Sequence, residues 1–227
     1  MLHELSKTVL LIVAALFPII NPPATAFIIL SMVPNASPAE RAEMARRIAI
    51  NSLVILLASL SIGAYLLSFL GISIPVLRVA GGIIVSMSGW RMLNEPDATE
   101  QRRSEAPAYP RSIDTPPSRL AFYPLTMPLT TGPGTISVAI SIGAGRPTGF
   151  HAALIAFFLE TLAAALLLVL LIYLLYRHSA RIADFIGPTG TTIIVRLSAF
   201  LLFCIGIQVF WNGAADLLSA LVIPASG

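Results

Sequence analysis

Residues 149–177 read GFHAALIAFFLETLAAALLLVLLIYLLYR, and this stretch decides the fold class. Before its terminal Arg177, the only acidic or strongly basic side chain in it is Glu160. About 20 apolar residues form a helix of about 30 Å, which matches the hydrocarbon core of a bilayer. We therefore expect these residues to cross a membrane as a helix.

Five other apolar runs occur along the chain, at residues 5–33, 42–70, 74–94, 119–143 and 190–217. The 227 residues are 56% hydrophobic and 11% charged, with a mean hydropathy of +0.86, which lies outside the range of soluble domains. The alternating ten-residue segments of a membrane barrel are not seen. The sequence predicts an all-α, polytopic membrane protein with six transmembrane helices.

The basic residues predict the orientation. If the six runs alternate sides, ten arginines fall on one side, and only Lys7 and Arg146 fall on the other; the ten are Arg41, Arg46, Arg47, Arg91, Arg102, Arg103, Arg111, Arg119, Arg177 and Arg181. The positive-inside rule then predicts an inner-membrane protein with both termini in the periplasm. Residues 9–26 also resemble a cleavable signal peptide, but the same proline-bearing pattern recurs deep in the chain, which favours a retained helix.

An internal repeat divides the chain into residues 1–94 and 119–227, joined by a proline-rich, charged cytoplasmic linker at 95–118. Residues 17–22 (FPIINP) return as residues 123–128 (YPLTMP) at an offset of 106, and residues 77–79 (LRV) return as residues 195–197 (VRL) at an offset of 118. A duplicated unit with three spans enters the membrane from opposite sides. We therefore expect two inverted three-helix repeats.

Proline and glycine are predicted to interrupt the first and fourth helices. Residues 21–25 read NPPAT, and residues 124–135 contain three prolines and two glycines. Prolines remove backbone donors, so both helices should break at membrane depth, where unpaired backbone groups need a polar cavity or protein partners. The candidate substrate-binding residues are Asn21, Pro22, Thr25, Thr130, Thr131, Gly132, Gly134 and Thr135. The alternative is a pair of structural kinks whose hydroxyls repair the backbone.

Four further polar residues are candidates for coupling or for a pore. Glu160 lies about midway along its helix, where a carboxyl group must be protonated or paired, and Asn51 is its expected partner. A coupling proton or cation and a structural hydrogen bond are both open for Glu160. Arg78 and Arg196 lie at helix entrances, where acidic partners, helix carbonyls or lipid phosphates could also bind them.

Several classes of function have no support in the sequence. No zinc-protease, nucleophile-elbow or phosphate-loop motif is present, so we expect neither an enzyme nor a cofactor. The lone Cys204 rules out an internal disulfide and a cysteine-based metal cluster, and we expect it to be a small core residue. The net charge of +3 reflects membrane topology rather than nucleic-acid binding.

Four segments resemble the MarC family (UPF0056-type) of bacterial inner-membrane proteins: residues 71–82, 89–93, 128–137 and 203–210. The resemblance covers all six runs in order. It implies an architecture similar to six-helix neutral amino-acid transporters and LysE-type exporters.

The sequence and this resemblance together favour a secondary transporter of small neutral solutes, with amino acids as the expected substrates. The expected partners are that small molecule, a coupling proton or cation, and the lipid bilayer; a homo-oligomer is compatible with the pattern. The alternatives are a non-transporting scaffold or stress-response protein, and a passive channel.

Overall fold

The computed structural model describes residues 2–33, 36–94, 120–147 and 151–222, and every regular element within them is helical. In chain order these are α1 (Leu2–Ile20), α2 (Pro22–Met32), α3 (Pro38–Ser61), α4 (Gly63–Phe69), α5 (Ile74–Asn94), η1 (Ala121–Thr130), α8 (Pro133–Ala144), α9 (His151–Arg177) and α10 (Ser179–Val222). The predicted all-α class is confirmed. The predicted linker at 95–118 lies outside the described residues.

Within the described residues, five helical stretches are long and apolar enough to cross a membrane: Lys7–Met32, Pro38–Ser61, Ile74–Asn94, Ala153–Arg177 and Ser179–Ala220. They correspond to five of the six predicted runs. The remaining run, 119–143, is divided between η1 and α8, and neither piece is long enough to span a bilayer alone. The structure therefore establishes a multi-helix membrane protein, while the count of six rests on the sequence.

Two helix boundaries differ from the expected runs for local chemical reasons. α3 begins at Pro38 because Ser37 forms a capping box: the Glu40 amide donates to the Ser37 hydroxyl, and the Ser37 amide donates to the Glu40 carboxylate. α10 begins well before the predicted residue 190 and bends at Gly187, whose φ of 77° lies in a region that glycine adopts without strain.

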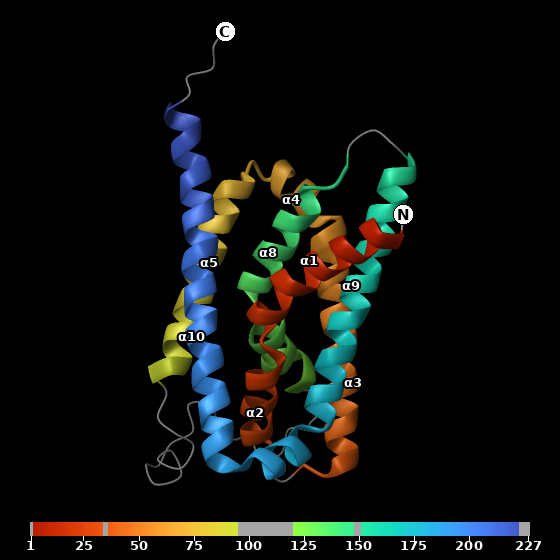
Figure 1. The fold of residues 1–227 in the computed structure, drawn as a ribbon, viewed down its shortest axis with the longest axis vertical. Helices are drawn as coiled ribbons and strands as arrows, with labels where there is room; N and C mark the ends of the chain where they lie inside the picture. Colours follow the sequence, from red (N-terminus) through yellow and green to blue (C-terminus); the bar gives the residue numbers. More distant parts are fainter. Residues whose placement is uncertain (1, 34–35, 95–119, 148–150, 223–227) are drawn as a thin grey trace.

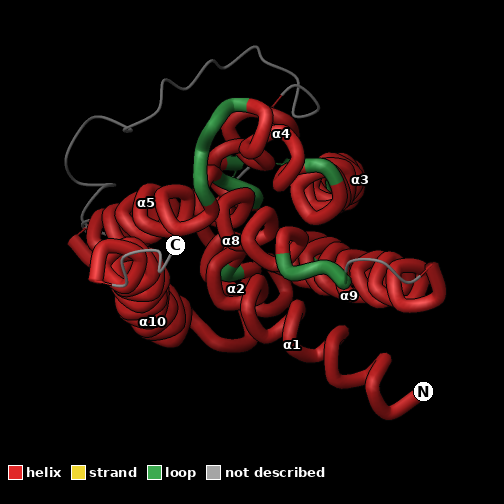
Figure 2. The backbone as a smooth tube through the Cα atoms, turned by 90° about the horizontal axis from the view of Figure 1, so that it is seen from above, coloured by secondary structure: helices red, strands yellow, loops and turns green. Residues whose placement is uncertain are grey.

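The helices form two outer groups with a third group between them. Seen from above, α5 and α10 lie together on one side, α3 and α9 lie on the other, and α2 and α8 lie between them (Figure 2). The end of α2, the start of α3, the end of α9 and the start of α10 lie at one end of the bundle, while the start of α1 and the end of α10 lie in the other half (Figure 1). The start of α3 and the ends of α5 and α9 share the first of these ends and carry Arg41, Arg46, Arg47, Arg91 and Arg177.

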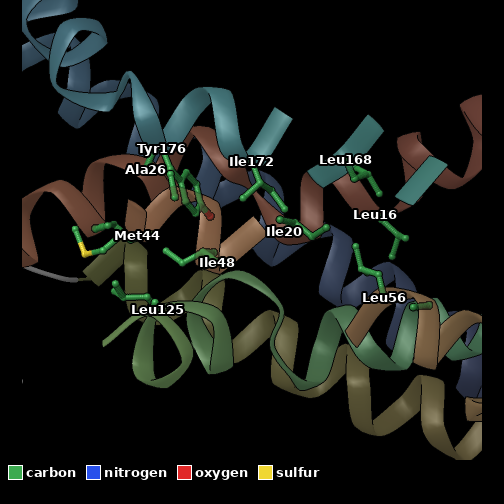
Figure 3. Close-up of a cluster of buried hydrophobic side chains, with 14 of the residues drawn as sticks. Leu16, Ile20, Ala26, Met44, Ile48, Leu56, Leu125, Leu168, Ile172 and Tyr176 are labelled. Carbon is green, nitrogen blue, oxygen red and sulfur yellow. The ribbon is translucent and has the colours of Figure 1, made fainter. Parts of the chain in front are cut away.

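One cluster of buried apolar side chains joins α1, α2, α3, η1 and α9 (Figure 3). Leu16, Leu56, Leu125, Leu168 and Ile172 are all fully buried within it. In lipid, such contacts stabilise through close packing rather than through exclusion of water. This cluster fixes the positions of α2 and η1, the two elements next to the helix breaks.

Small residues bring α5 and α10 into direct backbone contact. A Cβ atom on Gly82 would lie 2.3 Å from the Phe210 nitrogen, and one on Gly206 would lie 2.3 Å from the Ser86 nitrogen. Both positions therefore require glycine. Cys204, expected in the core, is instead exposed on α10. The helix faces α5 with its small residues, and Cys204 lies off that face.

Candidate functional site at two broken helices

The first break lies between α1 and α2, where it was predicted. Asn21 has φ 49° and ψ 55°, a left-handed conformation that asparagine tolerates better than most side chains. Pro22 and Pro23 carry no N–H, so the carbonyls of Pro18 and Ile19 lose their usual helical donors. The Thr25 hydroxyl donates to the neighbouring carbonyl of Ile20 at 3.2 Å and so satisfies a third acceptor at the break.

The second break lies between η1 and α8. Tyr123 and Met127 adopt extended angles inside η1 because each precedes a proline, which disfavours helical angles in the residue before it. Gly132 then forms the connection, and a Cβ atom on it would lie 2.4 Å from the Pro128 carbonyl oxygen. Only glycine fits at this position, and α8 begins at Pro133.

Threonine hydroxyls repair the second break as Thr25 repairs the first. Thr126 donates to the Ala121 carbonyl at 2.6 Å, and Thr130 donates to the Leu125 carbonyl at 2.7 Å. Each bond reaches five residues back along the chain, the same separation as in the Thr25 bond. Thr25 and Thr130, two of the candidate binding residues, therefore repair the backbone, as the alternative of structural kinks requires.

The two breaks lie next to each other, joined by a residue that the sequence did not single out. The Tyr176 hydroxyl of α9 lies 3.0 Å from the Thr130 hydroxyl, and the Thr25 side chain of α2 also lies beside it. Tyr176 is 3% exposed, and it lies in the same apolar cluster as Ala26 of α2 (Figure 3). α9 therefore connects the break in the first half of the chain with the break in the second.

Helix α3 supplies two more polar contacts to the second break. The Asn51 amide donates to the Thr126 hydroxyl at 3.3 Å, and the Thr131 hydroxyl donates to Ser52 at 2.8 Å. The predicted pairing of Asn51 with Glu160 is therefore wrong, because Asn51 faces η1. Ser52, Thr126 and Tyr176 were missed. Each of them is a polar side chain inside an apolar run, the same sequence feature that made Asn51 a candidate.

The buried side chains at the breaks are polar but carry no formal charge. In the described ranges the buried polar residues are Asn21, Thr25, Ser52, Ser59, Thr126, Thr130, Thr131, Thr135, Ser137, Thr161 and Ser179. The Asn21 amide nitrogen is buried without a hydrogen-bond partner within that part of the chain. A buried, unsatisfied donor of this kind costs about 1–3 kcal/mol unless an acceptor reaches it.

Three other candidate residues do not contribute buried polar side chains to the breaks: Gly134, Arg78 and Arg196. A Cβ on Gly134 would lie 2.2 Å from the Val85 side chain, so Gly134 allows α8 to pack against α5. Arg78 forms an ion pair with Asp216 of α10 at 2.7 Å, which gives Asp216 a partner that the sequence did not suggest. Arg196 is exposed on α10.

Glu160 is half-buried on α9, and no described residue pairs with it. It borders the buried face of the helix, next to Thr161, whose hydroxyl is buried and also lacks a described partner. The expectation that Glu160 faces the interior is met only in part. The helix turns it to the edge of that face.

A groove of about 200 Å³ lies elsewhere, against the outer side of α5 and α10, lined by Ser86, Met87, Trp90, Arg91 and Phe203. It does not involve the break residues. At the breaks, the hydroxyls of Thr25, Thr126, Thr130 and Thr131 each donate to a neighbouring oxygen, while the Asn21 amide nitrogen has no partner in the described residues.

Comparison with known proteins identifies the family. The profile described as "MarC family integral membrane protein" matches residues 6–218. The chain belongs to the MarC family. It is 33% identical over 219 residues to the "UPF0056 inner membrane protein MarC" of Escherichia coli O1:K1 / APEC, covering 95% of this chain and 97% of that protein.

Two further MarC proteins, from Salmonella paratyphi A and Citrobacter koseri, are each 32% identical over the same coverage. No solved structure matches the chain. The relatives' names describe inner-membrane proteins, which agrees with the apolar helices found here. These names state a location and give no transported compound.

Proposed function

We propose that the chain is a secondary transporter of small neutral amino acids, which bind between the two broken helices. The observation that carries the proposal is the buried, uncharged polar cluster where α2, α3, η1 and α9 meet. Transferring a net charge into such a site would leave that charge uncompensated, at a cost of several kcal/mol. A zwitterion has no net charge and still offers groups for hydrogen bonding.

Both ends of a zwitterion have complementary backbone groups at the breaks. The first-turn amides of α8, on Gly134 and Thr135, have no acceptor within their helix and suit a carboxylate. The carbonyls of Pro18 and Ile19, whose usual donors are replaced by prolines, suit an ammonium group. The proposal assigns the chain no enzymatic step and no cofactor.

The proposed architecture is two inverted three-helix halves, with α1–α2 equivalent to η1–α8. We align the two breaks at an offset of 110, which pairs Pro18 with Pro128, Pro23 with Pro133 and Thr25 with Thr135; the starts of α2 and α8, at Pro22 and Pro133, lie 111 residues apart. This offset replaces the 106 suggested by the sequence, because the short motif matched at 106 lies ahead of the second break. The arginine-bearing end of the bundle would face the cytoplasm and both termini the periplasm.

Ligand-dependent stabilisation of the purified protein tests the proposal. We expect alanine, serine and glycine to raise the melting temperature, while lysine and glutamate, which carry net charge, leave it unchanged. A ligand at 100 times its Kd adds about 2.7 kcal/mol, which a thermal-shift assay resolves easily. A non-transporting scaffold would show no shift with any amino acid, and that result would contradict the proposal.

Glu160 is proposed to couple transport to a proton or cation, since it is the acidic side chain within the described part of α9 and has no described partner. The variant Glu160→Gln keeps the shape of the side chain and removes its carboxyl group. We expect uptake by this variant to lose its dependence on external pH. The matched control is Thr161→Val, which removes the neighbouring orphan hydroxyl and should keep the wild-type pH profile. An unchanged profile in Glu160→Gln would exclude the coupling role.

A further inference from the structure

Thr25 and Thr130 at the two breaks already donate their hydroxyl protons to backbone carbonyls. This determines which ligand groups their oxygens can bind. The Thr25 hydroxyl donates to the Ile20 carbonyl, and the Thr130 hydroxyl donates to the Leu125 carbonyl. A hydroxyl has one proton, so both threonine oxygens are left as acceptors. The Thr130 oxygen lies 3.0 Å from the Tyr176 hydroxyl, and the Thr25 side chain also lies beside that hydroxyl.

The Tyr176 hydroxyl must therefore be the donor in its contact with Thr130. The Tyr176 hydroxyl has one proton and cannot donate fully to the oxygens of both Thr25 and Thr130. A primary ammonium group has three donors and would satisfy both oxygens at once. The orphan donor nearby, the Asn21 amide nitrogen, has the opposite requirement and suits a carboxylate oxygen.

We infer that the Tyr176 hydroxyl occupies the position of the substrate's ammonium group, so that Tyr176 closes the empty site and the substrate displaces it. This inference rests on the proposed function and deepens it, because it assigns the amino end of the substrate to Thr25 and Thr130 and the carboxylate end to Asn21. The substrate class narrows to compounds with a free primary ammonium group.

The location of Tyr176 explains how displacement would open a path. Tyr176 lies in the last turn of α9, beside Arg177, at the end of the bundle where the arginines gather. Its carbonyl accepts from the buried Ser179 hydroxyl at the start of α10 at 3.0 Å. Movement of the α9–α10 corner would carry the tyrosine away from the breaks and expose them to that end.

The variant Tyr176→Phe tests this inference and should fold, because each threonine keeps its bond to a backbone carbonyl. Tyr173→Phe is the matched control: it removes a hydroxyl one turn earlier, which contacts Arg177 rather than the breaks. A cysteine at Ser52, fully buried beside Thr131, reports access to the site once the native, exposed Cys204 is replaced by serine. The measurement is the rate of modification by the uncharged reagent hydroxyethyl methanethiosulfonate.

We expect Tyr176→Phe to raise the modification rate about fivefold without ligand, the effect of losing one ordinary hydrogen bond, and Tyr173→Phe to leave it unchanged. The variant Thr130→Val removes the oxygen that accepts this hydrogen bond from Tyr176, and it should raise the modification rate by the same factor. Equal rates in all variants, or an equal rise in Tyr173→Phe, would overturn the role of Tyr176. These outcomes do not require any transport activity.

The second arm adds ligands to the Tyr176→Phe protein. Alanine should slow modification of the cysteine, while propionate, which lacks the amino group, should not. Equal protection by both compounds would overturn the ammonium assignment. If neither compound protects, the proposed amino-acid site and this assignment both fail, while the ligand-free arm still decides whether Tyr176 closes the site.

Discussion

Gly206→Ala should destabilise the folded protein by about 3 kcal/mol, because the added methyl group collides with backbone rather than with a movable side chain. The new Cβ would lie 2.3 Å from the Ser86 nitrogen and 2.8 Å from its Cα. The facing Gly82 has the reciprocal restriction, with a Cβ 2.7 Å from the Gly206 carbonyl oxygen. α5 and α10 would have to move apart along their whole contact.

The free energy of unfolding, measured by titration with sodium dodecyl sulfate in mixed micelles, checks this prediction. Gly145→Ala is the control, because its Cβ would approach only the Ile142 carbonyl oxygen, at an ordinary 3.4 Å. It should change stability by less than about 0.5 kcal/mol. A Gly206→Ala protein as stable as Gly145→Ala would show that the helices do not pack this closely.

The features predicted correctly from the sequence are those set by local chemistry. Hydropathy over about 20 residues identifies a span, and clustered prolines break a helix, whatever the rest of the chain does. The breaks at Asn21 and Gly132 therefore followed from the sequence. The five long spans did so for the same reason.

Side-chain partners were harder to predict because they depend on how each helix is rotated about its axis. The expected depth of Asn51 and Glu160 suggested a pair, but rotation turns Asn51 toward Thr126 and leaves Glu160 at the edge of the buried face. A tyrosine next to a terminal arginine is typical of the membrane interface. Tyr176 is buried because α2 and η1 meet beside it, which no local pattern reveals.

The offset of the repeat shows the same limit. Short motifs matched the halves at an offset of 106, while α2 and α8 begin 111 residues apart, at Pro22 and Pro133. In the proposed site, Asn21 and Thr131 are a buried amide and a buried hydroxyl. Removing both should have the largest effect on function.

The double variant Asn21→Gly, Thr131→Val should lower the initial rate of alanine uptake about 100-fold. Each substitution removes one hydrogen bond to the substrate, worth about 1.4 kcal/mol, or a factor of ten. Glycine is preferred at position 21 because the positive φ of Asn21 would strain a larger apolar side chain. Valine keeps the shape of Thr131 and removes the hydroxyl that donates to Ser52 in this structure.

The control for the double variant is Ser59→Ala, Thr161→Val, which removes two buried hydroxyls away from the breaks. It should transport alanine within about twofold of the wild type. Circular dichroism and thermal melting of both double variants establish that they fold, so that a loss of uptake reports on the site itself.

Uptake of labelled alanine into proteoliposomes containing the wild type, the two double variants or no protein tests the central claim most directly. We predict saturable uptake by the wild type and by the Ser59, Thr161 variant, and uptake near the protein-free level for the Asn21, Thr131 variant. Wild-type flux no greater than that of protein-free liposomes, or equal flux through both double variants, would contradict a neutral amino-acid site between the broken helices.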